Sequence, residues 1–171
     1  MKRVAILLSA CAVCWMVVGA RGGDPVKLPL DNEFLVKVAP CNFAVIKISK
    51  MAETQGSPDV KAFAVHAVKD HQAVYEKLAT LLKNRKISVV SGTESATKAE
   101  IKRLDDLKGA DFDRAYLKWV IKEQKSGISL CENQIRLGKD ADVSAFSKEI
   151  LETGRKHLQK AEELSKTISS K

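Results

Sequence analysis

Two histidines occupy positions where the pattern of the chain predicts apolar residues. Around His71, apolar residues recur at alternating intervals of three and four: Val60, Ala64, Ala67, Val74, Leu78 and Leu81. This spacing keeps one side of a helix facing a partner, so His71 is expected to point into a core. His157 lies on a similar seam between Thr153 and Ala161. Neutral imidazole is a ligand for Zn, Cu, Ni and Fe, so the pair could bind a transition-metal ion.

A hydrogen-bonded pair is the alternative to a metal site. Polar groups in a core need partners, and the two histidines could bond to each other, to Gln124 on the seam of a third helix, or to a buried water. Two ligands are fewer than the four of a structural zinc site or the three of a catalytic one. The Glu-x-x-His pairs of di-iron bundles are also missing, because Val68 and Gly154 stand three residues before the histidines. These residues favour the hydrogen-bonded interpretation over the metal site.

Four long amphipathic helices would position these side chains. The sequence predicts helices over residues 31–54, 58–84 and 110–137, and a fourth that starts at Asp140 or Asp142. Asp31 and Ser57 are of the residue types that cap helix starts, and Pro58 suits a first helical position. No strand pattern competes, so the expected fold class is all-α and the architecture is a four-helix bundle.

The connection between the second and third helices is too long for a simple turn. Antiparallel neighbours in a bundle are joined by about two to eight residues, whereas residues 85–109 separate these two helices. Thr97 and Glu100 have the spacing of a capping box for a short helix that ends at Gly109. We expect a crossover along the bundle, as in ferritin-like folds. An up-down-up-down bundle with a decorated loop is the alternative.

The N-terminal residues have the pattern of an export signal. Lys2 and Arg3 form a basic leader, residues 4–18 are almost wholly apolar, and Ala20 suits a signal-peptidase cut. We expect residues 1–20 to be a cleaved signal peptide, 21–30 a linker and 31–171 the bundle domain. Lipoprotein cleavage at Cys11 is the minority alternative. The protein is then exported, to the periplasm or the outer membrane.

The charge of the mature chain is typical of a solvated helical surface. The formal net charge is +8 and becomes +6 without Lys2 and Arg3. Most lysines alternate with acids, as in residues 97–108 and 156–166. The sequence has no arginine-rich block and no stacking platform of aromatic residues, so nucleic acid is not an expected partner. Weak association with anionic envelope surfaces is compatible with this charge.

Three segments resemble a family of exported bacterial proteins. They are SPDVKAFAVHAVKDH (57–71), LDDLKGADFDRAYL (104–117) and RKHLQKA (155–161), in that order and spacing. The chain is similar over residues 31–167 to the family catalogued as domain of unknown function 4142, whose members are often named outer membrane proteins. The resemblance implies a ferritin-like helical bundle without an established biochemical role.

The resemblance also implies where a site would lie. The family pattern has a glutamate in the first helix and histidines in the other three, and the matching positions here hold Val45, His71, Gln124 and His157. With a rise of about 1.5 Å per residue, all four lie near the middle of their predicted helices. Ferritin-like proteins build metal sites at this level of a bundle. His71 and His157 are the candidate ligands, Gln124 is a weaker one, and a transition-metal ion is the only cofactor indicated.

Other residues could support such a site. Asp70 could orient a basic neighbour, although it projects about 100° away from His71 around the helix. Tyr75 and Tyr116 could frame the site, or they could be core tyrosines with bonded hydroxyls. No serine, histidine and acid have the spacing of a nucleophile and its base, so no catalytic residue is assigned.

Two cysteines remain after the signal is removed. Cys41 lies on the predicted seam of the first helix: Phe34, Val38, Cys41, Val45, Ile48 and Ala52. Cys131 lies on the seam of the third long helix. If the crossover makes these helices antiparallel, the two sulfurs come to similar heights and could form a disulfide in an oxidising compartment. Two separate buried thiols are the alternative.

Two functional hypotheses follow. The first is a non-catalytic envelope protein with a binding or stress-related role and a degenerate metal site at mid-bundle. The second is a ferritin-like redox or metal-storage protein that uses His71 and His157. Neither the ligand nor the oligomeric state follows from the residues.

Export predicts a defined N-terminus. The mature chain is expected to begin at Arg21, because Ala20 ends the apolar run and its small side chain suits the peptidase. N-terminal sequencing of the purified protein checks this. A chain in the membrane fraction that keeps Met1 would contradict it, and a start at a lipid-modified Cys11 would support the lipoprotein alternative.

Overall fold

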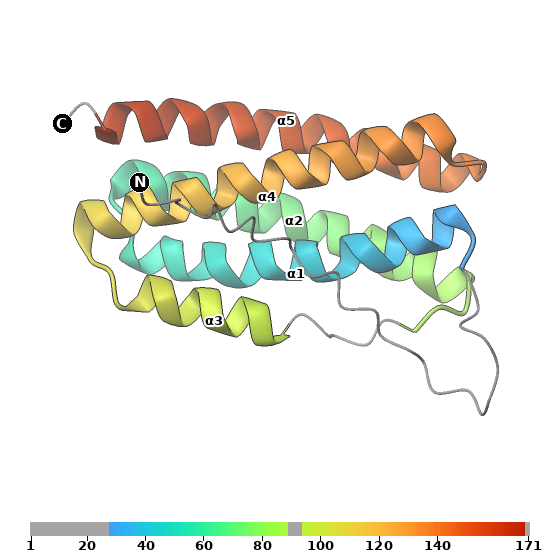
Figure 1. Ribbon diagram of the computed structural model, residues 1–171, viewed down its shortest axis with the longest axis horizontal. Coiled ribbons are helices and arrows are strands. Elements are labelled where there is room, and N and C mark those ends of the chain that lie inside the picture. Colours follow the sequence, from blue (N-terminus) through green and yellow to red (C-terminus); the bar gives the residue numbers. More distant parts are fainter. Residues whose placement is uncertain (1–27, 89–93, 170–171) are drawn as a thin grey trace, which may run out of the picture.

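The computed structural model describes residues 28–88 and 94–169, and these residues form an all-α fold (Figure 1). The helices are α1 (Leu30–Gln55), α2 (Pro58–Asn84), α3 (Glu94–Asp105), α4 (Gly109–Leu137) and α5 (Ala141–Ser169). The predicted four-helix bundle is confirmed. The predicted signal peptide and residues 21–27 of the linker lie outside the described residues. None of the described helices combines the length and the hydropathy needed to cross a bilayer.

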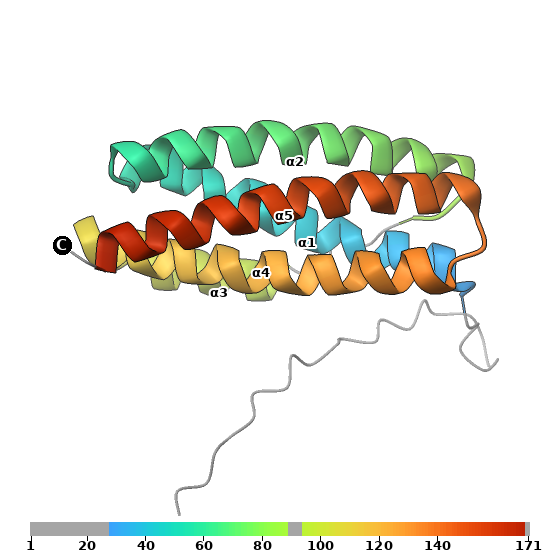
Figure 2. The same ribbon diagram turned by 90° about the horizontal axis from the view of Figure 1, so that it is seen from above.

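The connection between α2 and α4 is a crossover, as predicted. In Figure 1, α1 and α4 run in opposite directions, while α2 and α4 run in the same direction. The helix α1 packs against α2 and α4, and α5 packs against the same two helices. Figure 2 shows the four long helices side by side, and α3 lies against the outside of α1 and α4. The up-down-up-down alternative is wrong, because it would make α1 and α4 parallel.

The core consists of two apolar clusters at different heights. The first contains Ile48, Ala52, Val60, Phe63, Ala64, Leu104, Phe112, Tyr116, Leu117, Val120, Ala161 and Leu164. The second contains Phe34, Leu35, Val38, Val74, Leu78, Cys131, Val143 and Phe146. Burial of a Leu-sized or Phe-sized side chain contributes about 1.5–3 kcal/mol, so the two clusters supply most of the driving force for folding. Polar side chains occupy the interior between them.

The buried stripe of α1 differs from its predicted course at Cys41 and also includes Ser49 beside the predicted Ile48. Asn42 is 3% exposed and takes the inward place that the prediction gave to Cys41, which is exposed. Ser49 is also fully buried, and its Oγ lies 2.9 Å from the hydroxyl oxygen of Tyr116. The prediction followed apolar residues only, so it passed over two polar residues that belong to the core.

The predicted disulfide between Cys41 and Cys131 is absent from the structure. Both side chains are thiols. Cys41 is on the exposed face of α1, whereas Cys131 is 1% exposed within the second apolar cluster. Burial raises the pKa of the Cys131 thiol to about 12, which keeps it protonated and unreactive. The crossover gives the helices the directions that a bridge would need, but the Cys41 side chain faces outward.

The helix α3 begins and ends earlier than predicted. It starts at Glu94, so Thr97 lies inside the helix and is 7% exposed instead of capping the first turn. Glu100 pairs with Arg103 at 2.6 Å rather than completing a capping box. The helix ends at Asp105, and Gly109 begins α4 with a φ of 54°. This left-handed conformation favours glycine, so Gly109 marks the turn between two helices.

Carboxylates stabilise the starts of α2 and α5. Ser57 makes no side-chain capping bond, but its backbone N–H donates to Oδ1 of Asp113 on α4 at 3.1 Å. Asp113 is only 3% exposed, so this bond joins two helices inside the protein. Oδ1 of Asp140 accepts hydrogen bonds from the N–H groups of Asp142 and Val143, at 3.0 and 3.1 Å. Asp140 is therefore the cap of α5.

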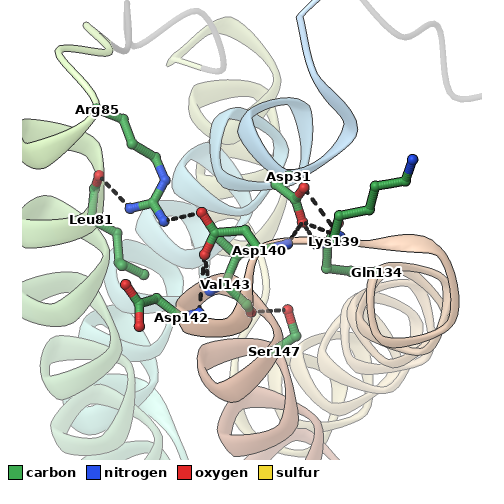
Figure 3. Close-up of polar contacts among 9 residues, drawn as sticks. All are labelled: Asp31, Leu81, Arg85, Gln134, Lys139, Asp140, Asp142, Val143 and Ser147. Carbon is green, nitrogen blue, oxygen red and sulfur yellow. Dashed lines mark hydrogen bonds and ion pairs between the residues drawn. The ribbon is translucent and has the colours of Figure 1, made fainter.

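Asp31 and Asp140 hold one end of the bundle together (Figure 3). Asp31 was the predicted cap of α1, but α1 begins one residue earlier, at Leu30. Its carboxylate instead accepts from the N–H groups of Lys139 and Asp140 in the turn between α4 and α5, at 3.2 and 3.3 Å. Asp140 also pairs with Arg85, just past the end of α2, at 2.6 Å. These contacts join the start of α1, the end of α2 and the α4–α5 turn.

Removing the Asp140 carboxylate is expected to destabilise the bundle. The substitution Asp140→Ala should lower the free energy of unfolding by about 1–2 kcal/mol, because the N-cap of α5 is lost. Asp142→Ala is the matched control, since it removes an exposed first-turn carboxylate that costs about 0.3 kcal/mol. Urea denaturation followed by circular dichroism measures both. Equal effects of the two substitutions would contradict the assignment of Asp140 as the cap.

Candidate functional site

A polar layer crosses the bundle between the two apolar clusters. It contains Asn42 from α1, Asp70 and His71 from α2, Gln124 from α4 and His157 from α5. Asn42, Gln124 and His157 are 3%, 6% and 6% exposed, and His71 is partly buried. A buried polar group without a partner costs about 1–3 kcal/mol, so the contacts within this layer bear directly on stability.

Asn42 fixes the position and the tautomer of His71. Nδ2 of Asn42 donates to the backbone oxygen of His71 at 3.0 Å, and Oδ1 lies 2.7 Å from Nδ1 of the ring. A carbonyl oxygen can only accept, so Nδ2 must face it and Oδ1 must face the ring. Nδ1 of His71 therefore carries the hydrogen, and Nε2 of the neutral ring has the lone pair. Nε2 of Gln124 is 3.4 Å from this lone pair, which is long for a hydrogen bond.

Asp70 fixes the tautomer of His157. Its Oδ2 lies 3.0 Å from Nε2 of His157. An ionised carboxylate only accepts, so Nε2 carries a hydrogen and Nδ1 of the neutral ring has the lone pair. Nδ1 is buried and has no hydrogen-bond partner among the described residues. The site thus contains a ring nitrogen whose lone pair can accept a hydrogen bond or coordinate a metal ion.

The two rings lie close together in a largely apolar setting. Their centres are 5.5 Å apart, with an angle of 34° between the ring planes. Phe63, 5% exposed, meets His157 in an edge-to-face contact with ring centres 6.0 Å apart. Burial, aided by the nearby His157, lowers the pKa of His71 from 6.5 to about 4, although Asp70 acts in the opposite direction. His71 is therefore neutral at neutral pH and available as a ligand.

The structure separates the predicted site residues into two groups. It brings His71, His157, Gln124 and Asp70 together in the polar layer. The expectation that Tyr75 frames this layer is wrong, because its side chain is 51% exposed. Tyr116 is fully buried one level away, where its hydroxyl contacts Ser49. Burial raises the pKa of Tyr116, so it is a neutral core tyrosine.

The residue that the sequence analysis missed is Asn42. It contacts His71 through two hydrogen bonds, but the predicted apolar seam runs through Cys41 and gives Asn42 no role. The sequence contains a signal for this position: Asn42 is four residues after Val38 and three before Val45, a spacing that places all three on one face of a helix. Val45 is also buried, at 4% exposed, and supplies no ligand atom at the position where the family pattern has a glutamate.

The arrangement excludes a ligand set of the usual size. In the described part of the chain, no group of three or more His, Cys, Asp or Glu residues is placed to hold a metal ion. Asp70 and Asn42 contact the outer nitrogens of the rings, which is the role of residues that orient metal-binding histidines. The polar layer can therefore offer two nitrogen lone pairs, each held in a defined tautomer, at the centre of a helical bundle.

The fold and this layer define a class of protein: an all-α four-helix bundle with a crossover and a pair of interior histidines. The chain matches the family described as domain of unknown function DUF4142 over residues 22–164 and belongs to that family. The resemblance seen in the sequence is thus confirmed. No curated protein matches the chain significantly.

Solved structures of other helical proteins are similar to this fold. CopM in its Cu(I)-bound form has a TM-score of 0.70 and 13% identity, covering 82% of this chain and 98% of that chain. A DUF305 fragment from Deinococcus radiodurans has a TM-score of 0.72 and 13% identity, covering 82% and 97%. A DUF305 protein from Streptomyces coelicolor, described as secreted, has a TM-score of 0.73 and 13% identity, covering 82% and 94%. At this identity the likeness concerns the fold alone.

His71 is expected to make the metal-free protein less stable in acid. Its pKa is 6.5 when unfolded and about 4 when folded, so the unfolded chain binds the proton first as the pH falls. The free energy of unfolding should decrease by up to about 3 kcal/mol on going from pH 7 to pH 4. Urea denaturation across this range measures the change. The His71→Leu variant should lose this part of the pH dependence. The control His66→Leu, which replaces an exposed histidine, should keep it. Identical pH profiles for the wild type and His71→Leu would contradict the assignment.

Proposed function

We propose that this protein is an exported, non-catalytic helical bundle that binds one transition-metal ion between His71 and His157. The ion would be held by Nε2 of His71 and Nδ1 of His157, the two nitrogens that carry lone pairs. Asn42 and Asp70 would keep the rings in the required tautomers through bonds of 2.7 and 3.0 Å. The ion would supply Lewis acidity and join α2 to α5 at mid-height.

The observation that carries this proposal is the buried, unpartnered Nδ1 of His157. A purely structural layer of hydrogen bonds, which the sequence favoured, would be expected to pair this atom. The two histidines instead bond to Asp70 and Asn42, and each turns a lone pair away from that partner. Metal–imidazole bonds are about 2.0–2.1 Å long, so two nitrogens that share an ion lie no more than about 4 Å apart. With the ring centres 5.5 Å apart, the two imidazoles would bind one ion in a bent arrangement, and Nε2 of Gln124 would have to move away from Nε2 of His71.

The similar structures are consistent with this function and with export. CopM has been solved with Cu(I), with Cu(II) and with Ag. One DUF305 neighbour is described as secreted. These properties belong to those proteins. They support the proposal because the same bundle architecture accommodates metal ions and occurs outside the cytoplasm.

A binding role accounts for the layer better than redox catalysis does. Di-iron bundles use glutamates that bridge two ions, and here Val68 and Gly154 stand where the Glu-x-x-His pairs would need glutamate. Gly154 is buried, and a side chain there would approach Oε1 of Gln124 to 3.3 Å. The glycine thus leaves room for Gln124 rather than for a bridging carboxylate.

Metal content tests the proposal. The mature protein, purified from the periplasm of an expressing cell, is expected to carry or take up one transition-metal ion per chain from a panel of ions, as measured by elemental mass spectrometry. His71→Leu and His157→Leu should each abolish this, because one imidazole cannot hold the ion alone. His66→Leu removes an exposed histidine from the same helix and should keep the ion.

Stability gives an independent readout of the same variants. In the metal-free state, His71→Leu should fold but lose about 1–3 kcal/mol of stability, because Oδ1 of the buried Asn42 is left without its partner. Retention of the same amount of metal by His71→Leu and His66→Leu would overturn the proposal. The polar layer would then have only a structural role, with a buried water donating a hydrogen bond to Nδ1 of His157.

A further inference from the structure

The outer side of α1 is apolar where a surface helix is usually polar. Apolar residues on α1 are not confined to the stripe that faces the core, because a second stripe has the same three- and four-residue spacing. This second stripe consists of Val36, Ala39, Phe43, Ile46 and Lys50. Its four apolar members are partly buried, and the charged residues between Glu33 and Glu53 are all lysines. The second stripe is therefore both apolar and basic.

A stripe of α2 lies beside the second stripe of α1. Asn42 and His71 join the two helices, and Ile46 and Tyr75 each lie four residues further along their own helix. Residues four apart are neighbours on a helix surface, so Ile46 and Tyr75 flank this contact, one on either side. Tyr75 is 51% exposed, so this flank is open to solvent. The α2 stripe consists of exposed residues: Lys61, Val65, Lys69, Gln72, Tyr75, Ala79 and Lys83. The two stripes together are called the α1–α2 face.

The lysines of the α1–α2 face have no acidic partners in the described part of the chain. The ion pairs between described residues include none of Lys50, Lys61, Lys69 and Lys83. Lys47 places its Nζ 5.1 Å from the ring centre of Phe43, in a cation–π contact. On α4 and α5, by contrast, five basic residues pair with acids: Arg114, Lys125, Arg155, Lys156 and Lys160. The α1–α2 face therefore keeps its positive charge uncompensated.

The charge of the α1–α2 face selects its partner. A second copy of the chain would bring lysines against lysines, which is unfavourable. A surface of anionic lipid instead supplies phosphate groups for the lysines, whose alkyl chains can lie along the apolar boundary. Phe43 and Tyr75 suit the same boundary, because their rings can enter it while the tyrosine hydroxyl stays among the headgroups. Lys61 and Lys83 are about 33 Å apart along α2, at about 1.5 Å per residue, so the charges match an extended surface.

We propose that the α1–α2 face docks the protein on membranes that contain anionic lipid, with α1 and α2 lying along the headgroups. Exposed apolar patches with polar rims mark interaction sites of this kind. The face is separate from the polar layer, whose Asn42, Gln124 and His157 are buried inside the bundle. Docking therefore goes beyond the proposed function and does not depend on a metal ion.

Vesicle binding tests the docking. The mature protein is mixed with phosphatidylcholine vesicles that contain or lack phosphatidylglycerol, and the bound fraction is measured by co-sedimentation. We expect binding only to the vesicles with phosphatidylglycerol, and weaker binding as the salt concentration rises, because salt screens exposed charges. A wild-type protein that binds neither kind of vesicle at low salt would overturn the proposal.

Matched lysine substitutions test which face binds. The double variant Lys50→Gln with Lys61→Gln should weaken vesicle binding about 25-fold, because each lysine near an anionic surface contributes about fivefold. The control is Lys118→Gln with Lys122→Gln, which removes two exposed lysines from α4 and leaves the same net charge. The control should bind nearly as well as the wild type. Equal losses in the two double variants would overturn the assignment to the α1–α2 face.

Substitutions of Tyr75 test the apolar contact. Tyr75→Trp should shift its fluorescence to shorter wavelength when anionic vesicles are added, because the ring leaves water. Leu137→Trp places the same probe at a 46% exposed position near the end of α4 and should show no shift. Tyr75→Ser should lower the bound fraction, whereas Leu137→Ser should not. Circular dichroism melting confirms that each variant is folded. Equal fluorescence shifts at the two positions would contradict docking through this face.

The outcomes also separate docking from the alternatives. A dimer in analytical ultracentrifugation that Tyr75→Ser abolishes, without vesicle binding by the wild type, would assign the α1–α2 face to a second copy of the chain and overturn the proposal. His71→Leu should bind vesicles as the wild type does, because His71 is not part of the face. Failure of docking would thus leave the metal-binding function standing, and failure of metal binding would leave docking standing.

Discussion

The bundle depends on one constraint: the polar groups buried at mid-height must find partners within the layer they form. Apolar stripes can slide along one another at modest cost, whereas a buried hydrogen bond fixes the positions of both groups, because an unpaired one costs about 1–3 kcal/mol. The helix α2 is central, since Asp70 and His71 contact α5 and α1. The hydrogen bonds of the layer therefore fix the axial register of α1, α2 and α5 more strictly than the contacts of the two apolar clusters do.

The crossover decides what surrounds this layer. It makes α1 antiparallel to α4, places α3 against both, and carries Leu104 into the first apolar cluster. At the opposite end, Asp31 and Asp140 connect the start of α1 with the α4–α5 turn (Figure 3). The two ends of the bundle are thus closed by specific contacts, and the polar layer lies between two packed clusters. This is a rigid setting for a pair of histidines.

The same physics that stabilises the layer accounts for its chemistry. Desolvation keeps His71 neutral, and Asn42 and Asp70 use the hydrogen-bonding sides of the two rings. What remains is Nδ1 of His157, which has no hydrogen-bond partner among the described residues, and Nε2 of His71, which has one long contact of 3.4 Å with Nε2 of Gln124. Val45 adds no ligand atom at this level, and Gln124 adds only an amide.

The sequence by itself determined the four long helices, because helical periodicity and the positions of glycine and proline are local properties of the chain. The length of residues 85–109 favoured a crossover but left an up-down-up-down bundle open, and the short helix α3 has other bounds than expected. It also placed His71, Gln124 and His157 at the same height, since the rise of a helix is constant. Only the tertiary structure decided that Asn42 faces the core in place of Cys41, that Asp31 contacts the α4–α5 turn, and that Asp70 reaches His157. These contacts join residues far apart in the chain and depend on how each helix is rotated about its axis. That rotation is set by the packing of all the helices together. The periodicity of apolar residues does not predict the rotation where the residue that faces the core is polar.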